Sequence, residues 1–242
     1  MAHARARSRV ACRSLFLSVS PHRRAFVLPW HDIRWRGCLG VCHRNNGCRT
    51  LCVREGVLLS PQVVFAENLN HIQQELQRSK EDFILEHFAK YTSPEFPPVW
   101  KTLEIVSLGT LSKLYYNMSD KAIKKQIAHD LDVPQHLYLE SWIKATTLLR
   151  NCIAHHARIW NRSFPNMPQL PKRMPKAWIS STRLPMMKLY AQLCCIAYMQ
   201  NSIHPDNTFK QDLFALLEAH PNVDVKAMGF PANWREEPLW KD

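Results

Sequence analysis

Hydrophobic residues recur at helical spacing through most of the chain from residue 61 onward. Apolar positions three or four residues apart are typical of α-helices, and strand-like alternation of apolar and polar residues is absent. The pattern predicts helices over approximately 61–90, 99–117, 120–131, 135–160, 184–202 and 208–220. Tyr91–Pro98 and Phe164–Met174 carry three prolines each and are expected to be loops. The predicted fold class is therefore all-α, a helical bundle.

Residues 1–60 show no such periodicity. They contain five of the eight cysteines and no lysine. One interpretation is a zinc knuckle formed by Cys38, Cys42, Cys48 and Cys52, although the three-residue spacing within each pair is wider than a tight knuckle requires. The other is translation in a shifted reading frame, which enriches Arg, Cys, Trp, His and Ser. We expect 1–60 to be out of frame or disordered and 61–242 to form the helical domain.

Most of the net charge of +12 belongs to this N-terminal segment. Residues 1–60 hold eleven Arg against two acids, whereas residues 61–242 hold 21 Lys and Arg against 18 acids. Affinity of the helical domain for a polyanion must therefore come from a local basic patch. The chain has no run of 18 apolar residues and no secretory signal at its start, so we expect a cytoplasmic protein without a membrane partner.

The predicted helix 135–160 has two faces with different chemistry. At 100° per residue, one face is predicted to pack into the core and the opposite face is polar and basic. The core face would hold Trp142, Ala145, Leu149, Cys152, Ile153, His156 and Trp160, and the polar face Lys144, Thr147, Asn151, His155, Arg158 and Arg162. His156 is thus expected to be buried and His155 to be exposed.

The segment Arg150–His155 carries the side chains that metal-free RNA cleavage requires. The Arg150 guanidinium can bind a phosphate in a bidentate manner, and the His155 imidazole can transfer a proton near neutral pH. Asn151 can orient either group, while Arg158, Arg162 and Lys144 are candidate contacts to RNA phosphates. No metal or other cofactor is expected. Because an Arg and a His five residues apart are common by chance, a solvated helix face is the competing interpretation.

The longer string Leu149–Arg162, LRNCIAHHARIWNR, resembles the signature of bacterial Abi-like (abortive infection) proteins. Three further segments resemble the same family: Arg78–Phe83 leading to Phe96–Trp100, Glu104–Tyr115, and the C-terminal Met228–Trp240. The resemblance covers about residues 62–242. This family is related to the HEPN superfamily, whose R-x4-6-H motif marks metal-independent endoribonucleases and their inactive relatives.

The resemblance implies a phage-defence or toxin-type endoribonuclease with a HEPN-like helical bundle. Arg150, Asn151 and His155 would take the arginine, polar and histidine positions of the motif. It also implies RNA as substrate, a homodimer in which two motifs face each other, and a neutralising antitoxin. Relatives carry a further N-terminal helical half, so a truncated or frameshifted member is expected. The alternative is a non-catalytic module that binds RNA or protein.

Overall fold

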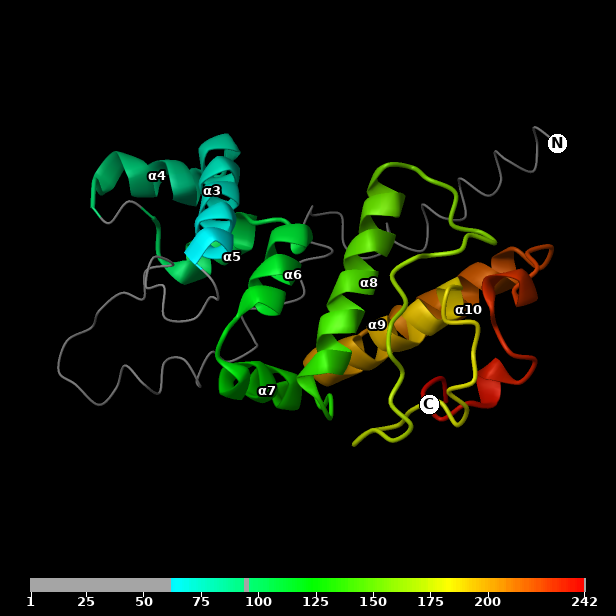
Figure 1. Ribbon diagram of the computed structural model, residues 1–242. Coiled ribbons are helices and arrows are strands. Elements are labelled where there is room, and N and C mark those ends of the chain that lie inside the picture. The colour runs from blue at the N-terminus through cyan, green and yellow to red at the C-terminus, as the bar shows by residue number, and fades with distance from the viewer. Residues whose placement is uncertain (1–61, 94–95, 242) are drawn as a thin grey trace. The chain divides into compact units, whose positions relative to one another are not determined.

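The computed structural model describes residues 62–93 and 96–241, which form eight α-helices and two short 3-10 helices without any β-strand in those ranges (Figure 1). The predicted all-α class is confirmed. The described chain packs as two compact units, one ending at Ile127 and the other beginning at Ala128. The cysteine-rich segment and the predicted boundary at residue 60 lie outside the described residues. None of the described helices has both the length and the apolar character needed to span a bilayer.

The first unit is built from short helices: α3 (Gln62–Arg78), α4 (Asp82–Lys90), α5 (Val99–Ile105), α6 (Leu108–Asn117) and most of α7 (Lys121–Asp130). The predicted helix at α7 is confirmed, and the described residues of the predicted loop before α5 are not helical. The prediction of single helices over 61–90 and 99–117 was wrong, because each is divided in two. Ser79–Glu81 separates α3 from α4, and Val106–Ser107 separates α5 from α6.

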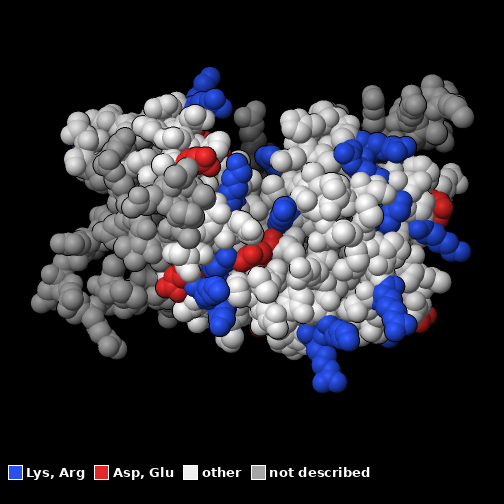
Figure 2. Space-filling model, viewed as in Figure 1, with Lys and Arg blue, Asp and Glu red and all other residues white. Residues whose placement is uncertain are grey.

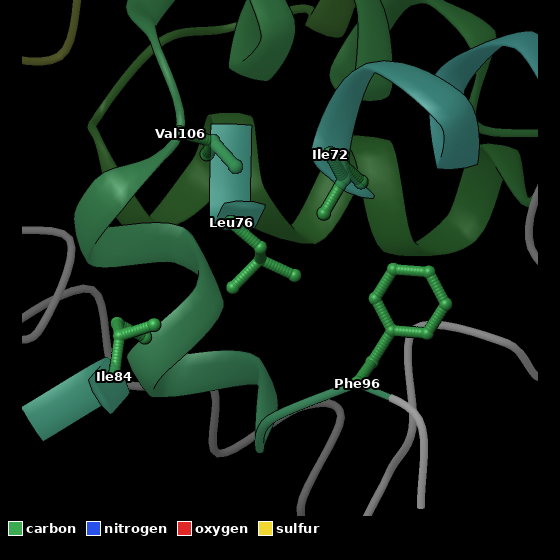
Figure 3. Close-up of a cluster of buried hydrophobic side chains, with 5 residues drawn as sticks. All are labelled: Ile72, Leu76, Ile84, Phe96 and Val106. Carbon is green, nitrogen blue, oxygen red and sulfur yellow. The ribbon is translucent and has the colours of Figure 1, made fainter. Parts of the chain in front are cut away.

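The breaks allow side chains from four segments to meet in one core. Ile72 and Leu76 of α3, Ile84 of α4, Phe96 and Val106 point toward one another and are all nearly inaccessible to solvent (Figure 3). A continuous helix fixes the directions of its side chains, whereas a break lets α4 turn Ile84 toward Leu76. Burial of this cluster decides where the helices end. The spacing of apolar residues along one segment does not predict such contacts between segments.

A carboxylate stabilises the start of α6. Glu75 of α3 accepts hydrogen bonds from the backbone nitrogen of Ser107 and from the hydroxyl of Thr110, both at 2.5 Å. Ser107 is the N-cap and accepts a hydrogen bond from the Thr110 nitrogen at 3.1 Å. A negative charge at this end of the helix also complements the helix dipole.

The second unit is arranged around α9 (Leu189–Ile203), in which every residue from Leu189 to Met199 is buried. A helix that is apolar and buried on all sides is the centre of its domain. It is contacted by α8 (His136–Ala154) and by α10 (Phe209–Ala219), as Figure 1 shows. α9 begins five residues later than the predicted start at residue 184, because Leu184–Lys188 forms a turn that ends in a hydrogen bond from the Lys188 nitrogen to the Pro185 carbonyl.

α10 lies where the pattern placed it, and Thr208–Gln211, whose residue types match a capping box, does not form one. Thr208 is the N-cap residue and makes no side-chain bond to the helix backbone. Its hydroxyl instead donates to the Asp212 carboxylate at 2.9 Å, while Asn207 accepts from the nitrogen of Phe209 at 3.1 Å. Asn207 therefore takes over part of the capping role.

The C-terminal tail packs back on α9. Tyr190 lies 4.7 Å from Phe230 between ring centroids and accepts a 3.0 Å hydrogen bond from Trp240. Gly229 closes the 3-10 helix Lys226–Met228 with φ of 88°. A Cβ atom at Gly229 would lie 2.6 Å from the Cβ of Lys188, so only glycine allows this approach of the tail to the start of α9.

Candidate active site

The helix that carries the Arg150–His155 motif ends at Ala154, six residues before the predicted end at Trp160. A Schellman motif terminates it: the His156 nitrogen donates to the Ile153 carbonyl at 2.9 Å, and the Ala157 nitrogen donates to the Cys152 carbonyl at 2.8 Å. His156 has a φ of 54°, the left-handed conformation that usually selects glycine at this position. Because no glycine stands here, the residue types did not predict that the helix would end.

The early stop overturns two of the predicted core positions. His156 and Trp160 are both exposed, the latter at 38%. A continued helix would have turned the His156 imidazole toward the core, where a polar group without a partner is costly. Ending the helix leaves the imidazole in water and still buries Ile159, which is 5% exposed, and Phe164, which is inaccessible.

The three predicted catalytic residues lie together at this end of α8. The guanidinium of Arg150 donates a 3.1 Å hydrogen bond from Nη1 to the Oδ1 atom of Asn151. His155 is the C-cap residue, and its nitrogen still donates an α-helical hydrogen bond to the Asn151 carbonyl at 3.0 Å. Its side chain therefore lies one turn beyond Asn151 on the same face of the helix. Arg150 and His155 are exposed and Asn151 is half-buried.

The remaining basic candidates do not form the continuous helical stripe that was predicted. Arg158 and Arg162 lie after the end of α8, in the connection to α9. Arg158 is exposed, and the guanidinium of Arg162 lies 5.9 Å from the centroid of the Phe164 ring. Lys144 is exposed on α8, about 16 Å from His155 along the axis at 1.5 Å per residue. It can reach only a phosphate several nucleotides from one bound at His155.

The region around the motif contains no acidic residue over a long stretch of sequence. From Ser141 to Pro205 there are nine Lys and Arg and no Asp or Glu. Figure 2 shows that Lys and Arg lie mostly as separate groups on the face in view, with fewer acidic side chains. Asp132 pairs with one of them, Lys176, at 2.6 Å, and the excess of the remaining basic side chains gives this part of the chain a positive potential. The charge count over residues 61–242 does not show this feature, because acids elsewhere in the domain offset the basic residues. It becomes visible when acids are counted along shorter stretches of the sequence.

The connection from α8 to α9 brings further basic residues to the side of α8. It returns along the helix: the Gln169 nitrogen donates to the Ser141 hydroxyl at 3.0 Å, and Trp142 donates to the Gln169 carbonyl at 2.7 Å. Exposed Lys172 and Arg173 follow directly. Sequence reasoning missed both because it treated this segment as a plain proline-rich loop.

The carbonyl end of a helix does not attract anions by itself. The helix dipole is negative at this end, and the nitrogens of residues 155, 156 and 157 are occupied by the α8 carbonyls. Phosphate affinity here must therefore come from side chains, chiefly Arg150 and the Asn151 amide nitrogen. Within residues 66–93 and 96–241, no group of three or more His, Cys, Asp or Glu residues is arranged to hold a metal ion.

Comparison with known families supports the resemblance to Abi-like proteins. A family model described as Abi-like protein matches residues 49–161. The chain is similar to Abi-like proteins over this region, slightly under half of its length. The matched region starts upstream of α3 and ends just after Trp160, so it includes Arg150, Asn151 and His155 but stops before Arg162 and α9. No curated protein and no solved structure matches the chain.

Proposed function

We propose that this Abi-like protein acts in phage defence as a metal-independent endoribonuclease that cuts RNA at the C-terminal end of α8. The observation that supports the proposal best is the hydrogen bond by which Asn151 orients Arg150, one helical turn before the exposed His155. The acid-free stretch around them favours a polyanionic substrate.

The reaction begins when the ribose 2′-OH attacks the adjacent phosphorus. His155 takes the proton of the 2′-OH, or in its protonated form donates a proton to the departing 5′-oxygen. Arg150 stabilises the negative charge that develops on the phosphoryl oxygens. Because Oδ1 of Asn151 accepts from Arg150, its amide nitrogen remains to donate to a phosphoryl oxygen. The products are a 2′,3′-cyclic phosphate and a 5′-OH.

The chemistry requires two proton transfers, and the motif supplies one histidine for them. A homodimer in which two α8 ends face each other would supply a second His155, one acting as base and the other as acid. Such a pairing would also remove water from the exposed guanidinium, which strengthens its interaction with phosphate. The dimer is therefore part of the proposal.

Cleavage of RNA in EDTA tests the proposed activity. The wild type should cut RNA, and His155→Ala and Arg150→Ala should lose at least about 100-fold in rate, since general acid–base catalysis and charge stabilisation each contribute about 10²-fold or more. His156→Asn is the matched control, because it removes a neighbouring exposed imidazole while keeping a residue type that tolerates positive φ. It should retain the wild-type rate.

Two outcomes would contradict the proposal. Equal rates for the wild type and His155→Ala would remove His155 from the chemistry. RNA binding without cleavage under any condition would favour the non-catalytic RNA-binding module. The dimer has its own test, in which His155→Ala protein is mixed with the wild type and the copies exchange partners. Activity should fall with the square of the wild-type fraction if each site needs two His155 side chains, and in simple proportion to that fraction if each chain works alone.

A further inference from the structure

A tight turn directly after the motif presents an exposed aromatic ring, with an arginine on either side of it in the sequence. The nitrogen of Arg162 donates to the carbonyl of Ile159 at 3.1 Å, which closes a four-residue turn with Trp160 and Asn161 at its tip. Asn161 has a φ of 50°, a conformation that asparagine tolerates at the third position of such turns. Trp160 is 38% exposed, whereas the sequence predicted it to be in the core.

The turn is held in place from several sides. Ile159 before the tip is buried, and so is Phe164 beyond it. The Nζ atom of Lys188 donates to the side-chain oxygen of Asn161 at 2.7 Å, and the nitrogen of Phe164 donates to the carbonyl of Met187 at 2.7 Å. The indole is thus carried by a fixed backbone, which lowers the entropy lost when a flat ligand stacks on it.

The chemistry of the tip fits an unpaired nucleotide. Aromatic rings bind exposed bases by stacking, which a base inside a duplex does not offer. Arg158 and Arg162 flank the ring in sequence, and guanidinium groups bind the phosphates on either side of a stacked base. The nearest acids in sequence are Glu140 and Asp206, both far along the chain from the tip.

We propose that the turn Ile159–Arg162 is a base-stacking platform, on which Trp160 stacks against one unpaired base of the RNA while Arg158 and Arg162 hold the neighbouring phosphates. The platform selects single-stranded RNA over duplex and feeds the strand toward His155, five residues earlier in the chain. This inference rests on the proposed function only in taking RNA as the ligand, because stacking requires no cleavage.

Binding to a labelled single-stranded RNA, measured in the His155→Ala background so that the probe stays intact, tests the platform. Trp160→Ala should weaken binding about tenfold, within the range known for loss of one stacked base. Trp160→Phe keeps a ring and should stay within about threefold of the parent. Trp100→Ala is the matched control, because Trp100 is also exposed, at 62%, but lies on α5 in the other unit. It should not change affinity.

The phosphate contacts have a separate signature in salt. Removing one arginine that contacts a single strand should lower the slope of log affinity against log salt concentration by about 0.7. Arg158→Ala should show this decrease, and Arg78→Ala, an exposed arginine at the end of α3, should not. The duplex form of the same RNA should bind more weakly than the single strand and should be insensitive to Trp160→Ala.

The outcomes separate the platform from the ribonuclease. If Trp160→Ala binds the single strand as tightly as the parent while retaining its circular dichroism spectrum, or if the protein binds duplex more tightly, the platform is wrong even where RNA is cut. If Trp160→Ala loses binding and Trp160→Phe keeps it, the platform stands even where no cleavage is found. Failure of the parent to bind RNA at all would overturn the platform.

Discussion

Replacing His156 by glycine should stabilise the protein, although the change removes a whole side chain. His156 occupies the left-handed position of the Schellman motif that ends α8, with φ of 54°. Glycine adopts this conformation without the steric conflict between Cβ and the following carbonyl oxygen. The imidazole is exposed, and no hydrogen bond found within the described ranges involves it, so its removal should cost little.

The size of the effect follows from two opposing contributions. A residue with a Cβ in the left-handed conformation costs about 1–2 kcal/mol. Glycine adds about 0.4–1 kcal/mol of conformational entropy to the unfolded chain, which acts against folding. The net expectation is a gain of about 0.5–1 kcal/mol in the free energy of unfolding. For a chain of this length that corresponds to a rise in Tm of about 1–4 °C.

Urea unfolding followed by circular dichroism measures the difference. Two further variants test the same backbone conformation. His156→Asn should be close to the wild type in stability because asparagine tolerates positive φ, and His156→Val should be less stable because a β-branched residue does not. The sign of the stability change in His156→Gly tests where α8 ends. If α8 continued to Trp160, glycine would stand inside a helix and destabilise by about 1 kcal/mol. Destabilisation by glycine would therefore refute the cap described here.

Three further predictions test other contacts. Gly229→Ala should cost at least about 2 kcal/mol in thermal or urea unfolding, because the new Cβ combines a φ of 88° with a 2.6 Å approach to Lys188; a neutral result would show that the tail does not pack as described. Glu75→Gln should cost about 1 kcal/mol and the loss should shrink in high salt, since it removes the charge from the start of α6. Burial raises the pKa of Tyr198 to about 12 from the ordinary value of 10.0. The contribution of Tyr198 to stability should therefore be full below pH of about 10 and should fall as the pH rises toward 12. Tyr198→Phe should reduce this alkaline loss of stability, measured by unfolding at several pH values. An unchanged alkaline profile in Tyr198→Phe would contradict the prediction.

The periodicity of apolar residues was enough to predict the class and the helical segments, although it merged α3 with α4 and α5 with α6. It located α7, α8, α9 and α10 because each buries a face long enough to repeat at helical spacing. The Arg150–His155 motif was indicated by its residue types and their spacing. Neither prediction depends on what a helix packs against.

Where helices stop was decided by tertiary packing. The division of α3 from α4 serves a core that also contains Phe96 and Val106, which no local pattern connects with Ile84. The end of α8 at Ala154 follows from the burial of Ile159 and Phe164 after His156, which adopts the left-handed conformation. Glycine is the usual residue at such a position, so no residue type here predicted the end of the helix. The same stop turned Trp160 from a predicted core residue into an exposed one. Local residue patterns therefore predict the helical segments and the catalytic candidates. Which side chains around them face water is set by packing, because burial depends on contacts between segments that are far apart in the chain.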